Sequence, residues 1–205
     1  MAGTSRNPLR NLVAAFEELA GTVNSANPHI NTIQLTHACR LFAPSKNFNF
    51  GFAFMFVDVE LLNKEAAKTC KTIKALVEHD VAQGSAKVNS SPSRSLNRLK
   101  RVIEMVRIFF EQVLEDEGSD SIADPVIIAY NQVFAAYHGP TVREAVANAK
   151  DFLPTKSTLW NMLDEDDDSV IEPLEKYIAA SRVVTQYIES IFLSNESTTE
   201  LLRLI

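Results

Sequence analysis

The chain has 205 residues, a length that fits one large domain better than two small ones. Hydrophobic residues make up 46% and charged residues 22%, ordinary values for a globular protein that argue against disorder. Only six residues are glycine, roughly 3% against a typical value of about 7%, which disfavours turn-rich sandwiches, barrels and Gly-rich phosphate loops. The net charge of −6 opposes general attraction to nucleic acid or anionic membranes, so any anion site must be a local basic patch.

Apolar residues recur at helical spacing along almost the whole chain, which predicts seven or eight helices. The first four are expected at about 9–20, 32–42, 52–81 (with one break) and 94–114. Another opens at Asp124-Pro125, because aspartate and proline suit the first turn of a helix. Gly139-Pro140 either separates two helices or kinks one, and Leu153-Pro154 is a similar helix-breaking pair. A last helix is expected at about 169–193.

One segment has the alternation typical of a strand, because phenylalanine occupies every second position from 48 to 56. A lone strand would leave its backbone hydrogen-bonding groups without partners, and no second candidate strand is present in the sequence. We therefore predict a loop here, followed by a helix.

No motif for catalysis or metal binding is present, so the sequence predicts neither an enzyme nor a bound metal or cofactor. The four histidines are scattered. Cys39 and Cys70 have no CxxC or metal-like spacing, and without a signal peptide we expect them to be buried, reduced thiols in a cytoplasmic protein. The acidic run Asp164–Asp168 lacks the glycine and distal glutamate of a calcium loop, which favours a solvated turn before a helix. The N-terminus has no apolar targeting segment, and no apolar run is long enough to span a membrane.

The helix beginning near residue 93 combines cationic and apolar positions on one stripe. Arg94 and Arg98 are one turn apart, and Val102, Met105 and Phe109 continue the same face. One interpretation is that both arginines extend from the end of a core stripe and keep their charges in water. The other is a site for an amphiphile, whose anionic head meets the arginines and whose tail follows the apolar positions.

A second helix offers Glu60 and Lys64 at a spacing of four residues, with Phe56 on the same stripe and Phe52 at its start. Taken alone, this spacing is most typical of a surface ion pair.

These segments together resemble the glycolipid transfer protein family over about residues 8–194, with extensions at 1–7 and 195–205. Three motifs in the same order carry the resemblance: Arg98 to Arg101 with Met105-Val106 and Phe109 to Gln112; Asp124-Pro125 with Tyr130, Gln132 to Ala135, Tyr137 to Gly139 and Arg143; and Leu153 to Lys156 with Leu159 and Asn161 to Leu163.

The resemblance implies an all-α, two-layer sandwich of about eight helices that encloses one sphingolipid. It also implies a head-group site in which Glu60 accepts from the ceramide amide, His138 donates to the amide carbonyl, and Lys64, Arg94 and Arg98 bind the head group. Phe52, Phe56, Val102, Met105 and Phe109 are expected to line the pocket for the lipid chains.

The residue at position 98 indicates the class of head group. Sugar-binding members of the family carry a tryptophan there, which stacks on the sugar, whereas phosphate-binding members carry arginine. Guanidinium groups suit a phosphate with a charge of about −1.5 to −2. Arg98 therefore favours a phosphate head group.

Two positions depart from the family pattern. Glu60 is one methylene longer than the usual aspartate, and Asp58 is not an obvious substitute because two residues along a helix point about 200° apart. Pro140 stands where the family has a tryptophan that helps the protein dock on membranes, and Trp160 fits either the core or a membrane contact.

The resemblance implies intermembrane transfer of ceramide-1-phosphate or a similar sphingolipid by a cytoplasmic protein that touches membranes transiently. Transfer of a glycosphingolipid or another phospholipid is the alternative within the same class. A lipid sensor or interaction module with little transfer is the alternative from another class. Nucleic acid is not expected as a partner.

Overall fold

The computed structural model describes residues 7–42, 53–68, 70–116 and 118–204, and in this part of the chain the secondary structure is helical throughout. Phe48, Phe50 and Phe52, for which we predicted a loop leading into a helix, lie outside the described residues. A helix is present from Ala53. The long helical segment predicted to 81 contains two helices, α3 and α4, rather than one continuous helix. The helices are α1 (Pro8–Val23), α2 (Thr32–Arg40), α3 (Ala53–Lys68), α4 (Ile73–Ala82), α5 (Pro92–Glu115), α6 (Ala123–Val133), α7 (Pro140–Ala149), α8 (Lys156–Leu163), α9 (Ile171–Leu193) and α10 (Glu196–Thr199), with short 3₁₀ turns η1 (Lys150–Phe152) and η2 (Glu200–Arg203).

Short polar side chains begin several of these helices. Asn7, Asn31, Thr72, Ser91 and Thr155 each accept a hydrogen bond from a backbone N–H in the first turn of the helix that follows. Such caps satisfy donors that have no partner inside the helix. The caps therefore fix where α1, α2, α4, α5 and α8 start.

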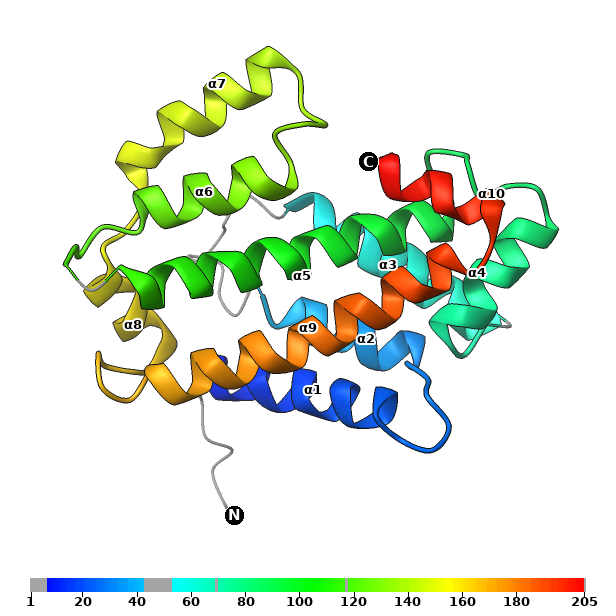
Figure 1. Cartoon of the computed structure of the whole chain (residues 1–205), viewed down its shortest axis with the longest axis horizontal. Coiled ribbons are helices and arrows are strands. Elements are labelled where there is room, and N and C mark those ends of the chain that lie inside the picture. The colour runs from blue at the N-terminus through cyan, green and yellow to red at the C-terminus, as the bar shows by residue number, and fades with distance from the viewer. Residues whose placement is uncertain (1–6, 43–52, 69, 117, 205) are drawn as a thin grey trace.

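Gly139-Pro140 separates two helices rather than kinking one. Gly139 is the cap of α7 and Pro140 is its first residue, where the missing N–H of proline costs no helical hydrogen bond. Helix α6 packs along α5, and Figure 1 shows α7 on the far side of α6 from α5.

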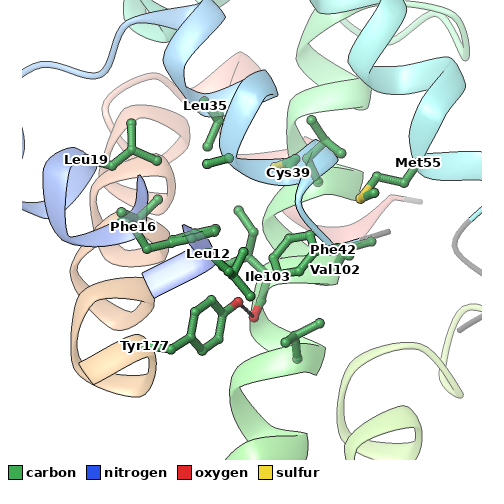
Figure 2. Close-up of a cluster of buried hydrophobic side chains, with 14 of the residues drawn as sticks. Leu12, Phe16, Leu19, Leu35, Cys39, Phe42, Met55, Val102, Ile103 and Tyr177 are labelled. Carbon is green, nitrogen blue, oxygen red and sulfur yellow. Dashed lines mark hydrogen bonds between the residues drawn. The ribbon is translucent and has the colours of Figure 1, made fainter. Parts of the chain in front are cut away.

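Five helices form a closed ring around the main core. Helix α1 packs on α2, α2 on α3, α3 on α5, α5 on α9, and α9 on α1 again (Figure 1). Each helix turns apolar side chains inward, and Figure 2 shows Phe16, Cys39, Met55, Val102 and Tyr177 meeting there, one from each of the five helices. The five helices thus enclose the main hydrophobic core.

Tyr177 is the largest fully buried side chain of this core. Its ring meets Phe16 and Phe110 edge to face at centroid distances of 5.0 and 5.3 Å, a favoured geometry for aromatic pairs. Its hydroxyl donates a 3.4 Å hydrogen bond to the carbonyl oxygen of Ile103, drawn as a dashed line in Figure 2. Burial raises the pKa of Tyr177, so the hydroxyl stays protonated and remains a donor.

The end of the chain packs on the first half of α5. Leu201 is fully buried, and the Asn97 amide donates to the carbonyl oxygens of Leu201 and Leu204 at 2.7 and 2.8 Å. The predicted domain boundary at 194 stays a prediction, but α10 and η2 are part of the packed structure. No helix among the described residues is long and apolar enough to cross a membrane.

Candidate functional site

The start of α5 is held in place by two polar side chains. Ser91 caps the helix through a 3.1 Å bond from the backbone N–H of Arg94 to its hydroxyl. The buried carboxylate of Asp80, from α4, accepts from the backbone N–H of Ser93 at 3.0 Å. These bonds fix the first turn of α5, which carries Arg94, and Arg98 follows one turn later.

Arg98 forms an ion pair with Asp58 of α3. Its Nε donates to Asp58 Oδ2 at 2.9 Å, and its Nη2 donates to Asp58 Oδ1 at 2.5 Å. The Asp58 side chain is only 4% exposed and that of Arg98 is 19% exposed. Nη2 also donates to Ser95 Oγ at 3.1 Å, and Nη1 donates to the carbonyl oxygen of Asn89 at 3.3 Å. The guanidinium is thus held in one orientation.

Arg94 lies close enough to Arg98 for the two charges to repel. Burial lowers the pKa of Arg94, and the positive charge of Arg98 lowers it further. Two guanidinium groups this close favour the approach of an anion, because an anion screens their repulsion and accepts several directed hydrogen bonds.

His138 lies in the turn between α6 and α7, stacked on the ring of Phe134 at a centroid distance of 5.6 Å. Its Nδ1 is 3.0 Å from the hydroxyl of Tyr130. Burial lowers the pKa of His138 and raises that of Tyr130, so both are neutral at pH 7. When the tyrosine hydroxyl donates to Nδ1, the hydrogen of the ring is on Nε2 and is available to a carbonyl group.

Arg101 supports the same turn. Its guanidinium lies 3.9 Å from the centre of the Tyr137 ring, and its Nη1 donates to the carbonyl oxygen of Val133 at 3.4 Å. Its Nη2 also donates to the carbonyl oxygen of Leu202 in η2. Arg101 therefore ties the segment that carries His138 to α5 and to the end of the chain.

Glu60 and Lys64 occupy an exposed face of α3. The Glu60 carboxylate, 59% exposed, accepts from Arg40 of α2, so the ion pair expected between Glu60 and Lys64 is replaced by one with another helix. The structure brings Asp58, rather than Glu60, to Arg98. Asp58, which did not stand out in the sequence as a substitute for the family aspartate, is thus the acidic residue of α3 that pairs with Arg98. The part that Glu60 and Lys64 play in binding stays a prediction.

The apolar continuation of the arginine stripe is inside the protein. Val102 and Phe109 are buried and Met105 is partly buried, which places them along the core as the helical spacing predicts. Phe56 is 40% exposed and lies at the surface of α3. Phe52, the remaining predicted pocket residue, lies outside the described residues.

Comparison with known proteins identifies the family. The family model for glycolipid transfer protein matches residues 30–165. Accelerated cell death 11 of Arabidopsis thaliana is 35% identical over 194 residues, an alignment that covers 92% of this chain and 94% of that protein. The chain belongs to the glycolipid transfer protein family.

Solved structures of this family have the same fold. A mutant of Arabidopsis ACD11 complexed with C12 ceramide-1-phosphate has a TM-score of 0.87 at 33% identity, covering 94% of this chain and 98% of that one. Human ceramide-1-phosphate transfer protein in complex with 12:0 ceramide-1-phosphate has a TM-score of 0.82 at 17% identity, covering 96% and 99%. The resemblance stated from the three sequence motifs is therefore confirmed, as is the all-α fold.

The structure also places Trp160 and Pro140, the residues considered for membrane contact. Trp160 is buried in α8, so it belongs to the core. Pro140 is the first residue of α7, next to the turn that carries His138. Among the described residues, no group of three or more histidine, cysteine, aspartate or glutamate side chains is arranged to hold a metal ion.

Asp58 is the site residue that the sequence interpretation missed. It lies within the buried stripe of α3, three residues after Met55 and four before Leu62, and this spacing gave the signal that it faces the core. A carboxylate on a buried stripe requires a partner, and Arg98 is the cation that α5 presents to it.

Proposed function

We propose that this member of the glycolipid transfer protein family binds a sphingolipid with a phosphate head group, such as ceramide-1-phosphate, and carries it between membranes. The observation that carries the proposal is the pair of neighbouring guanidinium groups, Arg94 and Arg98, at the end of an apolar stripe on α5. The 35% identity to ACD11, whose mutant binds ceramide-1-phosphate in a solved structure, supports the same lipid class.

In this proposal, Arg94 and Arg98 bind the phosphate oxygens and Lys64 adds a third positive charge. His138 donates from Nε2 to the amide carbonyl of the ceramide, a role that its neutral ring and its bond to Tyr130 support. Glu60 accepts from the amide N–H once its bond with Arg40 is exchanged. Arg98 offers hydrogen bonds to a phosphate but no flat aromatic face for a sugar, which favours phosphate over a glycan.

The lipid chains enter between the five helices of the ring. Val102, Met105 and Phe109 continue from the arginines into the core, so a chain that follows them stays in contact with apolar side chains. Burying a chain releases about 0.8 kcal/mol for each methylene, which favours its entry between apolar side chains. The mechanism is binding and release, with no covalent step.

Membrane contact is brief in this proposal, and the protein works in the cytoplasm at cytosolic leaflets. Ile128 of α6 and Val142 of α7 expose apolar surface on the two helices that flank the turn carrying His138. Since proline replaces the family tryptophan at position 140, these side chains are the proposed contacts.

The experiment is transfer of fluorescent ceramide-1-phosphate from donor to acceptor vesicles. Arg94→Gln removes one guanidinium without leaving Asp58 unpaired, and we expect it to reduce transfer by about tenfold or more, the effect of losing one charge-assisted hydrogen bond. Arg107→Gln is the matched control on the same helix. Its partner Glu111 keeps a 2.8 Å bond with Arg182, so transfer should stay at the wild-type level.

Two outcomes would contradict the proposal: no transfer by the wild-type protein, or undiminished transfer by Arg94→Gln. Faster transfer of galactosylceramide than of ceramide-1-phosphate would favour the sugar-headed alternative. Tight binding seen by native mass spectrometry, without transfer, would favour a lipid sensor.

A further inference from the structure

Asp58, Ser95 and Asn89 together occupy most of the hydrogen-bonding capacity of Arg98. The Asp58 carboxylate takes the edge formed by Nε and Nη2, with distances of 2.9 and 2.5 Å. The second hydrogen of Nη2 goes to Ser95, and one hydrogen of Nη1 goes to the backbone carbonyl of Asn89. Only one of the five N–H groups of this guanidinium has no partner in these contacts.

A carboxylate in this position also cancels the charge of Arg98. The Asp58 side chain is 4% exposed, so water screens it poorly and its negative charge is felt at close range. A phosphate group that approaches Arg94 and Arg98 therefore meets a second anion behind the guanidinium. To use the Nε and Nη2 edge of Arg98, the phosphate must displace a buried carboxylate, and a buried carboxylate without its partner is strongly disfavoured.

We propose that Asp58 is an internal counter-anion of Arg98 that competes with the lipid phosphate and so lowers the affinity of the site for phosphate-headed lipids. This inference rests on the proposed function of the arginine pair. Asp58 acts through Arg98 and has no contact of its own with the lipid. A lower affinity is useful in a carrier protein, because a lipid that is bound less tightly is released faster at the acceptor membrane.

The test is direct binding of two lipids to the full-length protein: ceramide-1-phosphate and uncharged ceramide, each in phosphatidylcholine vesicles. Asp58→Asn removes the charge but keeps the size of the side chain, and its amide oxygen can still accept one bond from Arg98. We expect ceramide-1-phosphate to bind about tenfold more tightly and to be released more slowly, with ceramide binding unchanged. A purely structural role of Asp58 would change both lipids alike.

Two further variants control for charge and folding. Asp58→Glu keeps the negative charge, so its preference for ceramide-1-phosphate over ceramide should match that of the wild type. Glu65→Gln removes a negative charge from the same helix at a residue paired with Lys68, and it should bind both lipids as the wild type does. Circular dichroism establishes that each variant is folded.

The outcomes separate this inference from the proposed function. If the wild-type protein binds ceramide-1-phosphate but Asp58→Asn binds it equally or more weakly, Asp58 does not compete with the phosphate and only this inference fails. If Asp58→Asn binds ceramide more tightly by the same factor, the inference fails as well. If the wild-type protein does not bind ceramide-1-phosphate at all, the proposed function fails together with it.

Discussion

Replacing Arg98 with alanine is expected to destabilise the protein even when no lipid is present, because it leaves the Asp58 carboxylate buried without its cation. Removing one partner of a buried ion pair typically costs about 3–5 kcal/mol. Arg98 is 19% exposed, so water can reach part of the space it vacates, and we expect the lower value of about 2–3 kcal/mol. In a chain of this size about 1 kcal/mol shifts Tm by about 2–4 °C, so Tm should fall by about 4–12 °C.

The assay is urea unfolding followed by circular dichroism, applied to Arg98→Ala, Asp58→Asn and the double variant. In the double variant no charge is left buried, so we expect it to regain most of the stability that Arg98→Ala loses. The two substitutions should therefore deviate from additivity by about 1–2 kcal/mol. Additive effects, or an Arg98→Ala variant as stable as the wild type, would show that the ion pair does not form in solution.

Three further predictions concern other parts of the structure. Tyr130→Phe removes the 3.0 Å bond to His138, so it should slow lipid transfer several-fold while lowering stability by about 0.5–1.5 kcal/mol; equal transfer rates in the vesicle assay would contradict the proposed role of the ring. Glu165 accepts from Asn7 and Arg10 at 2.7 and 2.8 Å; burial raises the pKa of Glu165, but hydrogen bonds from Arg10, Ser169 and Asn7 outweigh burial and hold it below 4.5. The bonds to Glu165 therefore stabilise the folded state above pH 4.5 and lose their effect as the pH falls through the lowered pKa, so Glu165→Gln should lower Tm at pH 7 and match the wild type in acid; a constant difference in Tm across that range would contradict this. Burial raises the pKa of Cys39 to about 12, so its thiol should resist a maleimide reagent at pH 8 until denaturant is added, and rapid labelling of the native protein at Cys39, located by mass spectrometry, would be the contrary result.

Most of the helical architecture could be predicted from the sequence, because helix periods and caps are local properties. The stripe from Leu9 to Leu19 became the buried face of α1, and the break between α3 and α4 was expected. Gly139-Pro140 could mark either a boundary between two helices or a kink in one, and the structure has two separate helices. Glycine and proline fit both interpretations locally, so the sequence alone does not decide between them.

The partners of the charged residues were harder to predict. Helical spacing correctly put Asp58 and Glu60 on different faces of α3, but it did not say which face meets α5. Asp58 lies on the face that meets α5 because Met55 and Leu62 bury that stripe against the core, and Glu60 then meets Arg40 of α2. Likewise, the bond between Tyr130 and His138 joins a helix to the turn after it, which a helical repeat does not reveal.

The most direct measurement of lipid binding and transfer is a competition between head groups in one vesicle assay. Wild-type protein is given fluorescent ceramide-1-phosphate in donor vesicles, with unlabelled ceramide-1-phosphate, ceramide or galactosylceramide as competitor. A carrier that uses Arg94 and Arg98 to bind phosphate should transfer the labelled lipid and be inhibited best by unlabelled ceramide-1-phosphate. Absence of transfer, or stronger inhibition by galactosylceramide, would contradict a phosphate-binding role for the arginine pair.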